Sequence, residues 1–417
     1  MRTRPTLFLA LFLPLLATSL AGQKTSQVTI QQLRLCEAKP QTMYCFLPTF
    51  GLQEFQSVGL PPVALPGFLV LPGQNQVATN LSSLAGIELS FLPVMSPASG
   101  IAFTFDPQLG VVVPSRESLG PILSDRADTI GRNRVFLGFA YQHFGFDSFD
   151  GRPLRQSFGA GTLASITDLT VDQYTSYLGY GVTSRVEVSA IIPVKTVTFA
   201  ANGLMVTSID PLTFATTLGL APEVSRQQSG VGDITFRVKG TVWKRERGGV
   251  AAGVDLRTPT GDALNFLGAG AYGVKPFVAA SFGKSLGKVY LAPHLNLGFE
   301  FNGTSILGSP LVGQEGRLPR RLNYAVGAEV GLGKRVTGTA EFTGDRLFNA
   351  EKLVVPVTGT VDMVTITSRS INLTNASLGA KVNPFGHLVL TGNLTWRLNN
   401  AGLRARLVPL VGASYTF

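Results

Sequence analysis

Residues 407–417 alternate between apolar and more polar side chains and end the chain on an aromatic residue. Counted back from the C-terminus, the apolar positions are Phe417, Tyr415, Ala413, Val411, Pro409 and Leu407. Because successive side chains of a β-strand point to opposite faces, this pattern predicts one strand with a single apolar face. Such a strand is compatible with the edge of a soluble β-sandwich or with the last strand of a membrane barrel, and the rest of the chain decides between them.

Composition favours the membrane barrel. Charged residues make up only 14% of the chain, against about 25% in soluble domains. Apolar residues make up 45%, yet no stretch after the N-terminus approaches the roughly 20 apolar residues that a membrane helix needs. The terminal strand also resembles the C-terminal signal of bacterial outer-membrane barrels, which implies that the barrel assembly machinery reads Tyr415 and Phe417.

Residues 1–21 have the three parts of a secretory signal peptide. Arg2 and Arg4 form the charged start, residues 7–16 form the apolar centre, and Ser19 and Ala21 are the small residues before the cleavage point. The apolar centre is too short to anchor the protein. The residue directly after the cleavage point is Gly22 and not Cys, which argues against a lipoprotein. We therefore expect export to the outer membrane of a Gram-negative-type bacterium, where lipid and lipopolysaccharide surround the barrel.

The net charge of +10 does not indicate a protein that binds nucleic acid. The basic residues are scattered and the protein is predicted to be exported, so we expect the charges in turns, loops and the barrel lumen. No residues have the spacing of a zinc or calcium site and no nucleotide-binding motif is present, so we expect no metal and no cofactor.

The only two cysteines, Cys36 and Cys45, lie close together in the sequence. An even number of cysteines in an exported protein predicts a disulfide, and here one local bridge is the single possible pairing. A metal-binding or redox pair is the alternative, but no further ligands lie nearby.

Residues 22–131 differ from the rest of the chain. Prolines punctuate an apolar, nearly uncharged stretch over 22–99, and a proline blocks a central strand or a helix interior where it stands. So much apolar surface should be covered, so we predict that this region plugs the lumen or packs across its periplasmic mouth, with a loose tail as the alternative. We expect a turn of helix or a strand at 81–95, a hairpin at 101–113 and a short helix at 120–131.

From residue 132 to residue 417 the sequence predicts an antiparallel barrel of twelve strands. Short and long connections alternate, as in barrels whose short turns face the periplasm, and a soluble sandwich has no reason to keep this alternation. The count becomes fourteen if the 101–113 hairpin joins the wall. The predicted strands are 133–146, 169–181, 185–199, 231–243, 249–259, 272–284, 287–301, 321–333, 335–348, 369–382, 386–399 and 404–417.

Parity within these strands assigns one face to lipid and the other to the lumen. In 287–301, for example, Leu295 and Leu297 share the apolar face. The opposite faces place polar residues of both charge signs in the lumen: Glu187, Lys195, Arg237, Lys239, Asp255, Arg257, His294, Glu300, Glu329, Glu341 and Arg397. These residues either pair across strands and neutralise the interior or line a constriction or solute site, and both can hold together.

An enzyme is the least favoured class of protein. Of the three histidines, His294 is the one that parity places in the lumen. Outer-membrane phospholipases carry a Ser two residues after the catalytic His, whereas this chain has Asn296, and no pair of nucleophile and base is evident. We therefore predict that His294 is a pore or packing residue and that the protein is not an enzyme.

Several stretches resemble an outer-membrane pore family linked to meta-pathway phenol degradation. They are residues 180–193 (YGVTSRVEVSAIIP), 230–239 (GVGDITFRVK) and 255–262 (DLRTPTGD). Residues 120–131 and 139–151 are similar to related exported proteins. The resemblance covers about residues 115–300 well, and its motifs lie at turns and strand ends. The family is distantly similar to FadL-type transporters of hydrophobic compounds, which combine a barrel with an N-terminal plug.

The resemblance implies passive passage of small, aromatic or otherwise apolar solutes across the outer membrane. The alternative is a structural or adhesive barrel whose lumen is closed and whose long loops bind an external partner. The sequence itself does not name the solute or the direction of transport.

Overall fold

The structure is a computed structural model. It describes residues 36, 38–39, 41–46, 72–97, 103–106, 111–114, 118–155, 164–209, 216–220, 223–245, 247–309, 315–333, 335–354 and 365–417. The predicted signal peptide lies outside these residues.

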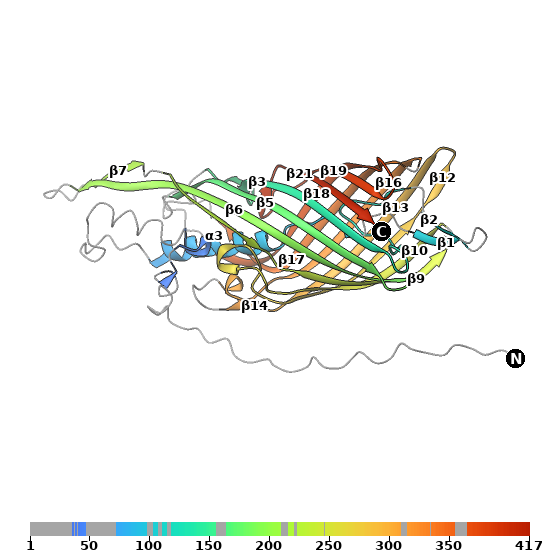
Figure 1. The fold of residues 1–417 in the computed structure, drawn as a ribbon. Helices are drawn as coiled ribbons and strands as arrows, with labels where there is room; N and C mark the ends of the chain where they lie inside the picture. Colours follow the sequence, from blue (N-terminus) through green and yellow to red (C-terminus); the bar gives the residue numbers. More distant parts are fainter. Residues whose placement is uncertain are drawn as a thin grey trace, which may run out of the picture.

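Within the described residues, twelve long antiparallel strands close into a barrel (Figure 1), and each pairs with its neighbour along the chain. The predicted fold class and strand count are therefore confirmed. The wall strands are β3 Val135–Phe149, β5 Ala164–Gly181, β6 Val186–Ile209, β9 Thr235–Arg245, β10 Gly248–Arg257, β11 Gly273–Phe282, β13 Val289–Asn302, β16 Arg320–Leu332, β17 Val336–Val354, β18 Thr365–Val382, β19 Leu388–Arg397 and β21 Leu407–Thr416.

The last strand closes the barrel by pairing with the first. Tyr415 of β21 is in register with Leu137 of β3, and Val411 with Tyr141. The final residue continues the ladder, because the Phe417 amide donates to the Val135 carbonyl at 2.8 Å. This pairing leaves neither strand with an open edge, as a wall in lipid requires.

Shorter elements extend or cover the two ends of the wall. The strands β7 and β8 lie in the long connection after β6, and β14 pairs with β15 in a separate sheet. The remaining elements are β4 Arg152–Pro153, β7 Thr216–Leu220, β8 Val224–Val231, β12 Lys284–Leu286, β14 Thr304–Ser305, β15 Gly316–Arg317, β20 Leu403–Ala405, η2 Ala263–Asn265 and η3 Ile306–Gly308. The long connections gather at one barrel end, and the short turns and the C-terminus at the other (Figure 1).

The predicted hairpin forms, but it does not join the wall. Its strands β1 (Phe103–Asp106) and β2 (Val111–Pro114) pair only with each other among the described residues. The wall therefore keeps twelve strands rather than fourteen. The hairpin lies at the short-turn end of the barrel (Figure 1).

One long helix, α3, occupies the opposite end. It spans Pro72–Ser90 and lies among the long connections (Figure 1), where Leu84 and Leu89 are buried in one apolar cluster with Phe266 and Leu307. The helix is longer than the turn of helix or strand that the sequence predicts for this part of the chain. None of the helices in the described residues has the length and apolar character needed to cross a membrane.

Residues 118–131, which we call the strap, run through the short-turn end of the lumen and lead into β3. The prediction of a short helix over 120–131 is wrong, because the described strap contains bends and turns but no helix. Its backbone groups bond to barrel side chains instead. The Glu341 carboxylate accepts from the amides of Ile122 and Leu123, and Lys381 donates to the Leu119 carbonyl. Charged partners of this kind outweigh local helix propensity.

The wall strands expose their apolar residues to the outside and bury the polar ones. In β13, Leu295 and Leu297 are about half exposed, whereas His294 and Glu300 are buried. In β16, Val326 and Val330 are exposed while Glu329 is buried. This alternation is that of a transmembrane barrel with a lipid-facing apolar surface.

The strap meets the wall most closely where it enters β3. A Cβ atom at Gly181 would lie 1.7 Å from the carbonyl oxygen of Gly131, whereas one at Gly392 would meet nothing within 4 Å. We therefore expect Gly181→Ala to lower the thermal unfolding temperature of the barrel by several °C, because overpacking costs about 1–3 kcal/mol. Gly392→Ala should leave it nearly unchanged. Heat-dependent mobility of the folded barrel in gel electrophoresis measures both, and equal transitions would contradict the close contact.

Candidate functional site

The barrel interior holds the charged residues predicted from strand parity. All of them except Arg397 are buried: Glu187, Lys195, Arg237, Lys239, Asp255, Arg257, His294, Glu300, Glu329 and Glu341. Arg397 is half-buried at the long-loop end of β19, where its guanidinium lies 2.5 Å from Asp147. The disulfide between Cys36 and Cys45 is present.

Several of these residues pair across adjacent strands because they occupy the same register row. Arg237 of β9 faces Asp255 of β10, which faces Lys275 of β11. The guanidinium and the ammonium lie 2.6 and 2.9 Å from the Asp255 carboxylate. Glu187 and Lys239 likewise share a row and lie 2.7 Å apart. The charges in these rows are therefore neutralised by partners on the neighbouring strands.

The strap binds the same charged rows. Asp125 of the strap lies 2.8 Å from the Arg237 guanidinium, and Lys239 donates to the carbonyls of Arg126 and Asp128 at 3.3 and 3.1 Å. The Ile130 amide donates to Glu187 at 2.8 Å. These contacts come from wall strands and not from loops, so they fix the strap to the most rigid part of the molecule.

Two carboxylates hold the first half of the strap. Glu341 accepts from the amides of Ile122, Leu123 and Ser124 at 3.2, 2.9 and 2.9 Å, and Glu329 accepts from the Ser118 hydroxyl at 2.5 Å. Converging backbone N–H groups of this kind form an anion-binding concavity, here around a barrel side chain. The imidazole of His294 lies 3.5 Å from the Glu341 carboxylate that binds the strap.

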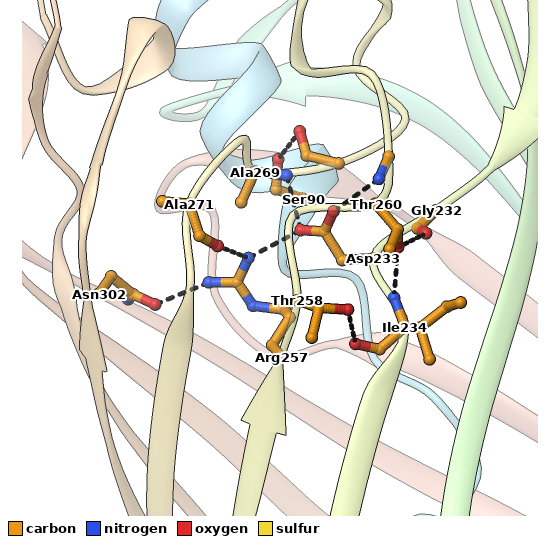
Figure 2. A network of polar contacts seen from close by, with 12 residues as sticks. Ser90, Gly232, Asp233, Ile234, Arg257, Thr258, Thr260, Ala269, Ala271 and Asn302 are labelled. Atoms are coloured by element: carbon orange, nitrogen blue, oxygen red, sulfur yellow. Dashed lines mark hydrogen bonds and ion pairs between the residues drawn. The ribbon is translucent and has the colours of Figure 1, made fainter.

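A second network lies nearer the long-loop end, around Asp233 and Arg257 (Figure 2). Arg257 donates to Asp233 at 2.8 Å and to Asn302 at 2.7 Å, and it also binds Glu300. Asp233 accepts from the amides of Gly261 and Ala269 at 3.0 and 2.8 Å. The carboxylate thus ties the connection after β10 to the wall.

Asp233 turns inward because the wall is interrupted between β8 and β9. Residues 232–234 belong to neither strand, and the segment after β10 bonds to several of their backbone groups. Thr260 accepts from the Ile234 amide and donates to the Gly232 carbonyl, as Figure 2 shows. Residues of the GVGDITFRVK and DLRTPTGD motifs therefore bond to each other and join the segment after β10 to the wall.

The end of α3 rests on this second network. Lys195 donates to the Leu89 carbonyl at 2.9 Å, and Arg321 donates to the Phe91 carbonyl at 3.1 Å. The guanidinium groups of Arg257 and Arg321 lie 5.2 and 4.7 Å from the centre of the Phe91 ring. Cations at the C-terminal end of a helix are favourable, because its free carbonyls carry partial negative charge.

A buried carboxyl group on α3 contacts the last long connection. Glu88 accepts from the Leu403 amide at 2.7 Å and is 7% exposed. Burial raises the pKa of Glu88 from 4.5 to about 8; the Leu403 amide and Arg404 lower it, and Asp150 raises it. Glu88 is therefore mostly protonated at neutral pH while α3 is docked.

Sequence reasoning missed several residues that complete these networks. Asp233, Lys275 and Arg321 are lumenal partners of predicted residues, whereas Lys381 donates to the Leu119 carbonyl of the strap. Strand parity applied to every charge would have found most of these four residues. Glu88 carried no sequence signal. Among the described residues, no group of three or more His, Cys, Asp and Glu side chains could hold a metal ion.

The fold and these interior networks define a transmembrane antiparallel β-barrel whose inward polar side chains bond to residues 118–131. A family model described as "Putative MetA-pathway of phenol degradation" matches residues 146–349, so the resemblance inferred from the motifs is confirmed. No curated protein matches the sequence significantly.

Several solved structures are similar in fold. An outer membrane channel from Pseudomonas putida F1 is 16% identical with a TM-score of 0.46, covering 70% of this chain and 98% of that chain. A Pseudomonas aeruginosa FadL homologue is 9% identical with a TM-score of 0.31, covering 78% of this chain and 99% of that chain. The Ralstonia pickettii toluene transporter TbuX is 11% identical with a TM-score of 0.32, covering 69% and 90% of the two chains.

We expect Glu341→Ala to release the strap from the wall. The change leaves three amides inside the lumen without an acceptor, and each unsatisfied group costs about 1–3 kcal/mol. Hydrogen exchange of residues 118–131, followed by mass spectrometry, should become roughly ten-fold faster or more. Asp345→Ala is the matched control, since this carboxylate lies on the same strand face and bonds Asn323 instead of the strap. Equal exchange in the two variants would contradict the role of Glu341.

We expect docking of α3 to weaken as the pH rises from about 5 to about 8.5. The pKa of Glu88 is about 8 when α3 is docked and 4.5 when the carboxyl is solvated. Between these two values only the undocked state loses its proton, so the free energy that favours docking is largest at low pH and falls as the pH rises. Exchange protection of residues 81–91, corrected for intrinsic rates, should fall roughly ten-fold or more across the window. Glu88→Gln should remove this dependence; a slope that persists in the variant would exclude Glu88 as its source.

Proposed function

We propose that the protein is an outer-membrane channel for passive passage of small hydrophobic or aromatic solutes, and that residues 22–131 form its plug. The observation that supports this most directly is a closed barrel whose inward polar side chains bond to two separate N-terminal segments, the strap and the end of α3. The strap binds wall strands at one end, and α3 binds the long connections at the other. A barrel that served only as a scaffold would need no such polar interior.

The proposed location and assembly follow from the same wall. Its outward apolar residues match a lipid environment, and we propose insertion into the outer membrane of a Gram-negative-type bacterium, beside lipopolysaccharide, after export by residues 1–21. We propose that the assembly machinery reads Tyr415 and Phe417, whose rings lie 4.7 Å apart at the end of the closing strand. The interior charges pair with protein groups, which supports passage and not chemistry as their role.

The closed, structural or adhesive barrel is kept as the second candidate because one observation favours it. The strap is bound by at least five buried charged side chains of the wall: Glu187, Arg237, Lys239, Glu329 and Glu341. Removing such partners is costly, so the strap itself is not readily displaced. A channel therefore requires that solutes pass beside the strap or that part of it moves.

Conductance in planar bilayers tests the proposal. We expect the full-length wild type to stay mostly closed with discrete openings, and Leu84→Asp to raise the open probability several-fold, because it puts a charge into the apolar contact that holds α3. Leu84→Met conserves volume and apolar character and should behave as the wild type. A barrel that conducts in none of the three proteins would favour the closed, adhesive alternative.

A further inference from the structure

The C-terminal end of α3 presents an aromatic ring and two carbonyl oxygens to cationic side chains of the wall. Lys195 and Arg321 each donate to one oxygen, at 2.9 and 3.1 Å. The Phe91 ring lies within cation–π distance of both Arg257 and Arg321. The acceptors and the ring come from residues 89–91, so a compact group of this chain combines an arene with partial negative charge.

The described carboxylates near this group pair with the two guanidinium groups and not with the ammonium of Lys195. Glu300 pairs with Arg257 and Arg321 at 3.1 and 2.8 Å, and Asp233 pairs with Arg257. Asp345 lies 4.0 Å from the Arg321 guanidinium. Lys195 forms no salt bridge with any carboxylate of the described residues, and its ammonium donates to the Leu89 carbonyl instead. This lysine is only 4% exposed. A buried ammonium that donates only to a neutral carbonyl would be stabilised further if a carboxylate took the position of that carbonyl.

The contacts that hold α3 in place come largely from the long connections. Ser83 donates to the carbonyls of Leu307 and Ser309, Ser90 donates to Gly268, and Leu403 donates to Glu88. Each of these partners lies between wall strands in the sequence. Much of α3 is thus held by segments that open at lower cost than the wall. When they open, another ligand can replace residues 89–91 beside Lys195, Arg257 and Arg321.

We propose that Lys195, Arg257 and Arg321 form a solute site for small aromatic carboxylates, which the end of α3 occupies in the closed state. The carboxylate takes the place of the Leu89 and Phe91 carbonyls, and the ring takes the place of Phe91 beside the two guanidinium groups. This inference rests on the proposed channel function and names its substrate class. Because the solute binds only after the end of α3 has left the site, its binding also shifts the population toward the open state.

The site discriminates by requiring both features of the ligand. A neutral arene such as phenol can take the ring position but leaves Lys195 without a negative partner. Acetate satisfies the ammonium but provides no ring for the guanidinium groups. Only a ligand with both parts replaces the contacts that residues 89–91 make with Lys195, Arg257 and Arg321.

Isothermal titration of the full-length protein in detergent micelles at pH 7 tests the site directly. We expect benzoate to bind roughly ten-fold or more tightly than phenol or acetate, because benzoate alone makes both a charge-assisted hydrogen bond and a cation–π contact. Lys195→Gln should weaken benzoate binding about ten-fold and leave phenol binding within about two-fold. Lys195→Arg should keep the preference for benzoate. Lys275→Gln, which removes another lumenal ammonium that pairs with Asp255, is the matched control.

A second readout follows the displacement of α3. Benzoate, but not acetate or phenol at the same concentration, should speed hydrogen exchange of residues 84–95 in the wild type and not in Lys195→Gln. Equal binding of benzoate and phenol, or an effect of Lys275→Gln as large as that of Lys195→Gln, would overturn the site. Should benzoate bind as expected while bilayers show no conductance, the site would stand and the channel function would fail. Conductance without benzoate binding would mean that the channel function holds and the site does not.

Discussion

Pairing of β21 with β3 is the constraint on which the rest of the structure depends. Lipid offers no hydrogen-bonding partners, so a sheet survives there only when its first and last strands satisfy each other. The register from Tyr415 and Leu137 onward fixes which side chains of both strands face inward. Once the wall is closed, every second residue of each strand is confined to one interior, and the polar ones must find partners within it.

The interior solves this requirement in two ways. Along β9, β10 and β11, opposite charges occupy the same register row, so Arg237, Asp255 and Lys275 neutralise one another across the wall. Elsewhere the barrel charges bond to backbone groups of the strap, as Glu341 and Lys239 do. Buried ion pairs add little net stability, but each becomes costly to break once formed. The strap therefore supplies hydrogen-bonding partners to lumenal charges of the wall.

Period-two alternation is sufficient to predict the wall, because the lipid and the lumen impose opposite preferences on successive residues. It also identifies Glu187, Lys239 and Glu341 as interior residues, but it does not say that their partners lie on the strap. Pro121 and Gly131 suggest a helix there, and the carboxylates of β6 and β17 take the same amides instead. Asp233 shares the parity of Arg237 and Lys239, so alternation also places it in the lumen. What alternation does not encode is that its partners include the amides of the connection after β10.

The two N-terminal elements differ in what holds them, and this difference suggests an order of events. The strap is bound by side chains of many wall strands, among them β6, β9, β17 and β18, so moving it would expose many buried charges at once. The helix α3 is bound mainly by loop carbonyls and amides, with Lys195 and Arg321 as its links to the wall. A solute or a change in protonation breaks the contacts of α3 before those of the strap. Opening should therefore begin at the long-loop end with α3, while the strap stays fixed and narrows the path beneath it.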